Sequence, residues 1–493
     1  MIAISPFLSH VSRPIGVLAI FVTVSLTAEP APRPNIIFVM ADDLGWTDVT
    51  CMGSKYYETP HIDRLAKEGI IFSSYYVYQN CAPTRAALLS GQYAPRTGVY
   101  TVGSFLRGRG KNRKMVPPPN QTKLPLDRFT LAQALKKAGY ATGMFGKWHL
   151  GTGGEYHPSK RGFDEAIVSN GRHFNFNTNP KTPYEKGAYL ADFLAGQAVK
   201  FIEKHKAHPF FLYLPHFAVH TPIHAKKELI EKYRPKKPVG GHKNPTYAAM
   251  IHSVDESVGR IMKKLDELGL SGNTLLIFTS DNGGLGGYQV PGTDKTKGIT
   301  DNTPLRGGKG TLYEGGVRVP FIARWPAVIQ PGTHCDEPAA HVDMYPTFLE
   351  LAGGKKESNT ILDGLSIAPL FRAPETKLDR KAIYFHFPGY LQAYIREATW
   401  RTTPVSTIRS GDYKLLEFFE DSRFELYNLK NDLSEKNNLV EKETEKVKEL
   451  HGMLLAWRKE IGAHMPRMKT AEELANPKES KAKNKKGKKK IRK

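Results

Sequence analysis

The sequence contains very little cysteine. Its 493 residues include only three, Cys51, Cys81 and Cys335. A small, odd number excludes a fold held by a disulfide framework, and no two of the three stand at the short spacing of a zinc site. Cys51 and Cys335 could form one bridge, but at least one thiol is left over.

Long hydrophobic runs are also missing. The run IGVLAIFVTVSLTA at residues 15–28 is short for a bilayer, follows Arg13 and ends in small residues. This pattern predicts a secretory signal at residues 1–28, with an uncleaved anchor as the alternative. We therefore expect an exported protein, periplasmic or secreted, that can stay at the cell surface. No membrane span is expected after cleavage.

Acidic residues are outnumbered, because 48 Asp and Glu face 71 Lys and Arg for a formal net charge of +23. A basic body favours an acidic partner such as a sulfated or carboxylated glycan, a nucleic acid or an anionic membrane. The segment 469–493 ends in KAKNKKGKKKIRK, which has no apolar pattern, so we expect a disordered basic tail. Such a tail favours a role in solubility or surface adhesion over nucleic-acid binding, so no nucleic-acid partner is expected.

Strand-length apolar runs alternate with helical patterns in the first three quarters of the chain. NIIFVM, PFFLYL and TLLIFTS are strand candidates, and the long segment 247–270 has apolar residues at helical spacing. This alternation predicts an α/β fold at 29–375, a large and mostly parallel sheet sandwiched by helices. The pattern changes at about residue 376, where short antiparallel strands and an amphipathic helix with Leu450, Leu454 and Trp457 predict a small α+β subdomain at 376–468.

Chemically capable side chains follow the predicted strands. Ligands of such sheets bind beyond the carboxyl ends of the strands, and the residues expected there are Asp42, Asp43, Lys147, His149, His220, Asp281 and Asn282. The three aspartates and the asparagine offer hard oxygen ligands for Ca²⁺ or Mg²⁺, of which Ca²⁺ tolerates irregular geometry better. An adjacent acid pair such as Asp42-Asp43 is also typical of an ordinary loop. A second pair, Asp281-Asn282, follows another predicted strand in the same way, and the two pairs together favour a metal site.

Cys81 stands at the predicted start of a helix, with Arg85 four residues later on the same face. A helix N-terminus favours an anion, so a thiolate here would be acidic and reactive, with Arg85 to steady it. The alternatives are a buried small hydrophobe and a Cys–His protease. Lys147 and Lys309 add positive charge, and two lysines, an arginine and a divalent ion around one point would bind a sulfate or phosphate group.

These motifs resemble the type I sulfatases of the alkaline phosphatase superfamily, from about residue 33 to 460. Cys81-Ala82-Pro83-Thr84-Arg85 matches the signature Cys-x-Pro-x-Arg, with threonine in place of the commoner serine. Further motifs follow in the family's order: Ala41-Asp42-Asp43-Leu44-Gly45, Gly146-Lys147-Trp148-His149, Val219-His220-Thr221-Pro222, Ser280-Asp281-Asn282-Gly283 and Gly308-Lys309-Gly310.

The resemblance implies an alkaline phosphatase-like fold and a sulfuric ester hydrolase with an unusual nucleophile. A maturation enzyme would oxidise Cys81 to Cα-formylglycine, whose aldehyde hydrates to a geminal diol. One hydroxyl would attack sulfur and release the alcohol. The second would then lose its proton and expel sulfate, which regenerates the aldehyde. The resemblance also implies one Ca²⁺, bound by Asp42, Asp43, Asp281, Asn282 and residue 81.

Roles for the remaining residues come from the same resemblance. Arg85 would hold the modified side chain, and Lys147 and Lys309 would bind the sulfate oxygens. His149 would assist in deprotonating the diol, and His220 would bind substrate and protonate the leaving oxygen, with His216 as its rival.

Two other functions compete with a sulfatase. One is a phosphoester or phosphonate hydrolase of the same superfamily, although two-metal members need further acids and histidines where Lys147 and Lys309 stand. The other is a non-catalytic binder of sulfated glycan. The basic stretches 103–123 and 224–245 favour a sulfated carbohydrate as substrate.

Overall fold

The computed structural model describes residues 1–2, 33–105, 112–289, 296–392 and 400–475, and the chain from Arg33 onward forms one compact unit. The predicted signal at 1–28 lies almost wholly outside the described residues. No helix within the described ranges is long and apolar enough to cross a membrane.

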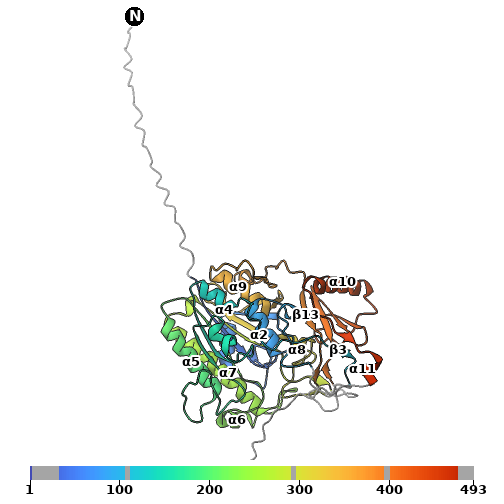
Figure 1. The fold of residues 1–493 in the computed structure, drawn as a ribbon. Helices are drawn as coiled ribbons and strands as arrows, with labels where there is room; N and C mark the ends of the chain where they lie inside the picture. The colour runs from blue at the N-terminus through green and yellow to red at the C-terminus, as the bar shows by residue number, and fades with distance from the viewer. Residues whose placement is uncertain (3–32, 106–111, 290–295, 393–399, 476–493) are drawn as a thin grey trace, which may run out of the picture. The chain divides into compact units, whose positions relative to one another are not determined.

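A nine-stranded, mostly parallel sheet forms the centre of this unit, as predicted (Figure 1). Its strands in spatial order are β11 (Thr333–Cys335), β2 (Ile70–Tyr76), β10 (Arg318–Arg324), β7 (Thr274–Ser280), β1 (Asn35–Ala41), β6 (Phe210–Pro215), β4 (Ala141–Gly146) and β5 (Glu165–Val168), and β12 (Ala339–Ala340) also pairs with β2. The strands from β7 to β5 run parallel, while β10 is antiparallel to both of its neighbours. The polar loops that follow β1, β6, β7 and β4 therefore leave the same edge.

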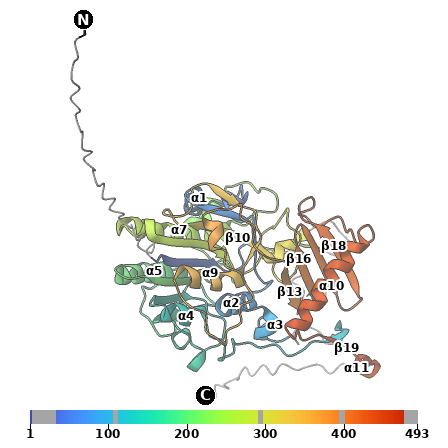
Figure 2. The same ribbon diagram turned by 90° about the horizontal axis from the view of Figure 1, so that it is seen from above.

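Helices cover both faces of the sheet (Figure 2). Successive side chains of β1 alternate between two cores, with Ile36 and Phe38 in one and Ile37 and Val39 in the other, because a strand turns alternate residues to opposite faces. The first core is closed by α2 (Cys81–Ser90), α4 (Leu131–Lys137) and α9 (Met344–Leu351). The second is closed by α1 (Pro60–Lys67), α5 (Leu190–His205) and α7 (Pro245–Glu267), and α6 (Lys227–Tyr233) packs on α7.

The C-terminal part forms a second sheet, which is antiparallel. Its strands are β13 (Ile383–Phe387), β16 (Val405–Ser410), β17 (Tyr413–Phe418) and β18 (Arg423–Asn428), and α10 (Thr444–Glu460) lies against them. Leu450, Leu454 and Trp457 of α10 are buried, as predicted from their spacing. The fold class is therefore confirmed, while the domain boundary at 375/376 stays a prediction.

Further short helices and strands lie between and after these elements. They are α3 (Ala94–Thr97), α8 (Glu314–Val317), α11 (Ala471–Ala475), β3 (Met115–Val116), β8 (Tyr288–Gln289), β9 (Thr296–Lys297), β14 (Leu391–Gln392), β15 (Trp400–Thr402) and β19 (Arg467–Met468). The helix α11 lies within the predicted tail 469–493, so the tail is not unstructured from its first residue, and residues 476–493 lie outside the described ranges. All three cysteines are free thiols, so the suggested bridge between Cys51 and Cys335 is absent.

Candidate active site

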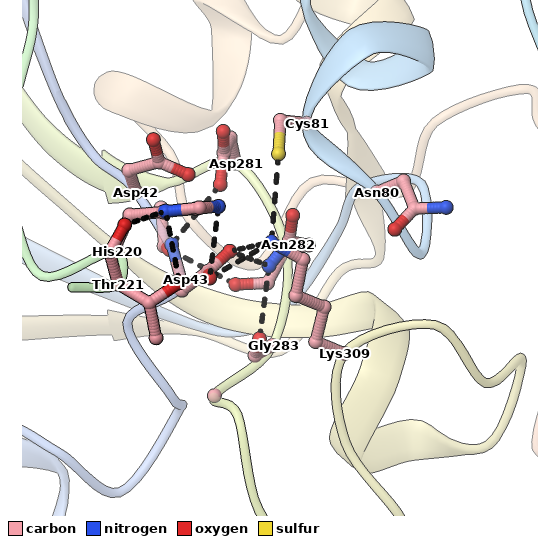
Figure 3. Close-up of polar contacts among 12 residues, drawn as sticks. Asp42, Asp43, Asn80, Cys81, His220, Thr221, Asp281, Asn282, Gly283 and Lys309 are labelled. Atoms are coloured by element: carbon pink, nitrogen blue, oxygen red, sulfur yellow. Dashed lines mark hydrogen bonds and ion pairs between the residues drawn. The ribbon is translucent and has the colours of Figure 1, made fainter. Parts of the chain in front are cut away.

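The predicted polar residues gather beyond the carboxyl ends of the central strands (Figure 3). Asp42 and Asp43 follow β1, Asp281 and Asn282 follow β7, and His220 comes from the loop after β6. Cys81 begins α2 and points its sulfur toward this group, while Lys309 enters from the loop before α8. The sheet topology thus brings together residues more than 260 positions apart, such as Asp43 and Lys309.

The loop after β1 is tied to the ends of both neighbouring strands. Asp42 donates its backbone N–H to the carbonyl of Ala218, at 2.9 Å, and its own carbonyl accepts from Val219 at 2.8 Å. The backbone N–H of Asp43 donates to Asp281 Oδ1 at 3.2 Å. These bonds hold Asp43 at a φ of 69°, a left-handed conformation that is uncommon for a residue other than glycine. Such strain is typical of functional positions.

Each of three buried carboxylates has a buried cation beside it. Arg85 donates from Nη2 to Asp281 Oδ2 at 2.6 Å, Lys309 Nζ lies 2.5 Å from Asp43 Oδ1, and Lys147 Nζ contacts Asp42. Burial raises the pKa of Asp42, but Lys147 and His220 outweigh it, so this pKa lies well below its ordinary value. Burial and the nearby Asp42 raise the pKa of Asp281 to about 6.

The cluster of oxygen ligands fits a hard divalent cation. Asp42, Asp43, Cys81 and His220 each place one ligand atom within 4.8 Å of the others. Asp42 Oδ1 and Asn282 Oδ1 are buried acceptors without a hydrogen-bond partner among the described residues. Buried acceptors normally have a partner, and carboxylate and amide oxygens are the ligands that Ca²⁺ prefers. The predicted ligands Asp281 and Asn282 border this group, since Asn282 Nδ2 donates to Asp43 Oδ1 at 2.9 Å.

Cys81 is buried at the N-terminus of α2, and its sulfur lies 3.6 Å from Lys309 Nζ. Burial raises the pKa of its thiol to about 12, although Lys147 and Lys309 act in the opposite sense. The expectation of an acidic thiolate from the helix N-terminus alone is therefore wrong, because it left out desolvation. Arg85 directs its described hydrogen bonds to Asp281 and to the carbonyl of Lys147, at 2.6 Å.

Thr84, the departure from the signature, supports the turn before α2. Its Oγ1 accepts from the backbone N–H of Tyr78 at 3.0 Å and donates to the carbonyl of Asn80 at 3.1 Å. A serine hydroxyl makes the same two bonds, so this substitution keeps the local geometry.

The three candidate histidines have different surroundings. His220 Nδ1 donates to the carbonyl of Thr221 at 2.7 Å, and its Nε2 lies 3.8 Å from Asp43 Oδ2. His216 is fully buried and pairs with Ser257 Oγ at 3.0 Å. His149 has a φ of 64°, and burial and Lys147 hold its pKa well below the ordinary value, so its ring is neutral at pH 7. Of the two rivals, His220 is the one beside the carboxylates.

Sequence reasoning missed residues that hold the predicted ones in place. His173 Nε2 donates to the carbonyl of His220 at 2.8 Å, and Tyr288 and Arg401 both donate to the carbonyl of Lys309. None lies in a recognisable motif. Each contacts a backbone carbonyl at least 21 positions away in the sequence, so no local pattern could have revealed it.

Comparison with known proteins agrees with this geometry. The family model "Sulfatase" matches residues 34–354, and the model "N-sulphoglucosamine sulphohydrolase, C-terminal" matches residues 308–460. A sulfatase of Formosa agariphila is 37% identical over 83% of this chain and 84% of its own length, and the N-acetylgalactosamine-6-sulfatase of Sus scrofa is 34% identical over 75% and 71%.

A solved structure shares both fold and sequence with the chain. The structure described as Ps i-CgsB in complex with k-i-k-neocarrahexaose superposes with a TM-score of 0.73 and 32% identity, over 86% of this chain and 92% of that one. The family match covers well over half of the chain, and the motifs meet at one edge of the sheet. The chain therefore belongs to the sulfatase family and is a sulfuric ester hydrolase.

Proposed function

We propose that this protein is an exported sulfatase that removes sulfate from a sulfated carbohydrate, with a formylglycine made from Cys81 and one bound calcium ion. The observation that carries the proposal is the position of Cys81. Its side chain lies at the buried start of α2, beside Lys309 and within 4.8 Å of ligand atoms of Asp42 and Asp43.

Asp42, Asp43, Asp281 and Asn282 would hold the calcium ion, with residue 81 in the same shell. Bound there, the ion supplies positive charge that polarises a sulfate oxygen and lowers the pKa of a coordinated hydroxyl. The unpartnered oxygens of Asp42 and Asn282 support this assignment. Formylglycine would supply, as its hydrate, the hydroxyl nucleophile that an ordinary thiol with a raised pKa does not provide. A formylglycine-generating maturation enzyme is therefore a required partner.

Lys147 and Lys309 would bind the oxygens of the sulfate group. The ammonium group of Lys309 lies beside Cys81 and Asp43, and that of Lys147 contacts Asp42. Buried positive charge stabilises charge that develops on the substrate's oxygens. Arg85 would balance the negative charge of Asp281 and hold the loop that follows β7 in place. Both its Nε and its Nη2 donate to the Asp281 carboxylate.

The two histidines would handle protons. His220 Nδ1 is occupied by the carbonyl of Thr221, which leaves Nε2 to donate a proton to the leaving oxygen as a general acid. His149 is neutral at pH 7, so its ring can accept a proton from the hydrate of residue 81. His220, near Asp43, would thus act as the acid, and His149, which follows β4, would act as the base.

A sulfated carbohydrate is the substrate class that the relatives favour. One relative is named for a 6-sulfated N-acetylgalactosamine, and one solved relative was captured with a neocarrahexaose. The net charge of +23 also supports a polyanionic substrate, because a positively charged protein attracts negatively charged partners.

The test is sulfate release from sulfated polysaccharides and oligosaccharides, with an aryl sulfate and an aryl phosphate alongside. The protein is co-expressed with a maturation enzyme, and Cys81→Ala is the control. We expect the wild type to release sulfate from a carbohydrate and Cys81→Ala to release none. Turnover of the phosphate ester alone, or sulfate release that survives Cys81→Ala, would contradict the proposal. Peptide mass spectrometry at residue 81 checks that the cysteine was converted.

A further inference from the structure

The loop that carries Lys309 has few side chains of its own to hold it. Its sequence is Arg306-Gly307-Gly308-Lys309-Gly310. Three glycines in five residues leave a backbone with high conformational freedom and no side-chain packing. The position of the Lys309 ammonium group beside Asp43 and Cys81 therefore depends on contacts that other segments make to this backbone.

Those contacts converge on Lys309 itself. Its N–H donates to the carbonyl of Gly284 at 3.0 Å. Its carbonyl accepts two hydrogen bonds, from Tyr288 Oη at 2.8 Å and from Arg401 Nη1 at 3.2 Å. The Arg401 guanidinium also lies over the ring of Tyr288, 4.9 Å from its centroid. Tyr288 and Arg401 thus contact each other as well as the carbonyl of Lys309.

Gly310 shows how closely Arg401 approaches the loop. Gly310 has a φ of +92°, and a Cβ built on it would lie 2.5 Å from Cδ of Arg401. A residue with a side chain would therefore push Arg401 away and would also be strained in this backbone conformation. The glycine after Lys309 is explained by the arginine that lies against it.

Both flanks of the loop are tied to the C-terminal part of the chain. Before Lys309, Arg306 Nη1 donates to Tyr427 Oη at 2.9 Å and to the carbonyl of Glu435 at 3.1 Å. After it, Lys414 Nζ lies 2.8 Å from Glu314 Oε1. Arg401 itself belongs to β15, so these two flanking contacts and the Arg401 bond to Lys309 all come from residues beyond 400.

We infer that Arg401 and Tyr288 are positioning residues, which fix the carbonyl of Lys309 and thereby aim its ammonium group at the sulfate of the substrate. This inference rests on the proposed function, because it takes Lys309 as a sulfate ligand. It assigns part of the catalytic geometry to β15, a strand outside the central sheet.

The experiment measures the affinity for inorganic sulfate by titration calorimetry, on full-length protein with formylglycine at residue 81 and calcium added. Lys309→Met should weaken sulfate binding by at least about 30-fold, because it removes a buried charge-assisted hydrogen bond. Arg401→Leu should weaken it by about tenfold, and Tyr288→Phe, which removes one hydroxyl, by a smaller factor. The double variant Lys309→Met/Arg401→Leu should bind no more weakly than Lys309→Met alone.

A matched control is Arg458→Leu. Arg458 is a buried arginine of α10 in the C-terminal part of the chain, and its Nη2 pairs with the carboxylate of Glu417 at 2.8 Å. Its loss should leave sulfate affinity unchanged, so a general loosening of this region is told apart from loss of the anchor. If Arg401→Leu fails to fold, Tyr288→Phe carries the test with a single-atom change.

Three results would overturn the inference. Unchanged sulfate affinity in both Arg401→Leu and Tyr288→Phe would show that the carbonyl contacts do not matter. Additive losses in the double variant would show that Arg401 acts without Lys309. Full affinity in Lys309→Met would remove the assumed role of Lys309, and that result alone would also count against the proposed function.

Discussion

The thiol of Cys81 is buried, and its environment disfavours the thiolate form. Its sequence position gave the helix N-terminus correctly, since α2 begins at this residue. The expected acidity was wrong because α2 is buried along its whole length, and burial raises the pKa of the thiol to about 12. A pattern predicts where a side chain stands in an element, whereas its desolvation depends on everything packed around it.

His220 gives the sharpest test at the scale of one residue. His220→Asn should lower kcat by about 10²- to 10⁴-fold for a sugar sulfate, because the departing alcohol needs a proton. The loss should be much smaller for an aryl sulfate with an acidic phenol, which leaves without one. The measurement is kcat for both substrate types in the wild type and the variant.

His216→Asn is the matched control for this prediction. His216 is the neighbouring histidine of the same loop region, but it is buried and pairs with Ser257. Its replacement should change stability without changing the ratio of the two kcat values. Equal losses for sugar and aryl sulfates in His220→Asn would argue against a general acid at this position.

At the scale of the element, the N-terminus of α1 is capped by a side chain of another helix. Threonine is a common N-cap residue, and Thr59 stands directly before Pro60, where α1 starts. The hydroxyl of Thr59 makes no cap bond to the backbone. The carboxylate of Asp255 in α7 accepts instead, from His61 N–H at 3.0 Å and Ile62 N–H at 2.8 Å. Start signals in the sequence predict where a helix begins. The group that accepts from its free N–H groups can come from almost 200 residues away.

The Asp255 cap predicts an unusual pH dependence. Burial raises the pKa of Asp255 from 3.8 to about 7, against the effect of the two backbone bonds. Because the folded-state pKa lies above the unfolded one, its contribution to stability is full below about pH 4 and is lost as pH rises to 7. Asp255→Asn should therefore lower the free energy of unfolding more at pH 5 than at pH 8. Urea denaturation of both proteins at the two pH values measures this, and a deficit that grows with pH would mean that Asp255 caps the helix as a charged group.

At the scale of the whole molecule, the alternating pattern predicted the sheet, its two helical layers and the C-terminal α+β part. It also predicted which strand ends carry polar groups, since parallel strands deliver their following loops to one edge. The antiparallel direction of β10 was not predictable, because a buried strand has the same apolar pattern in either direction. The anchors on Lys309 and His220 were not predictable either, since they arise only when distant segments meet.

A buried charge cluster joins the C-terminal sheet to the catalytic part. Lys414 of β17 lies 2.8 Å from Glu314 of α8 and 2.9 Å from Glu435, and all three side chains are almost fully buried. Burial raises the pKa of Glu314 and of Glu435. Lys414 outweighs it at Glu314, whose pKa falls to about 2, while that of Glu435 rises to about 7. The lysine is thus the cation that both carboxyl groups share, and Arg318 adds a second positive charge 3.4 Å from Glu314.

Removal of that counter-charge should destabilise the protein in a pH-dependent way. Lys414→Met should cost about 3–5 kcal/mol at pH 8, because it removes the cation paired with Glu435 and the nearer of two cations beside Glu314, the other being Arg318 at 3.4 Å. Loss of the positive charge should raise the folded-state pKa of both carboxyl groups above their values in the wild type, so the stability deficit should shrink as pH falls toward 5 and the carboxyls take up protons. Lys430→Met, at an exposed lysine, should stay within about 0.5 kcal/mol of the wild type. A deficit of Lys414→Met that is the same at pH 5 and pH 8 would mean that the lysine contributes through the packing of its alkyl chain, and that the two parts of the molecule are joined by contact area rather than by charge.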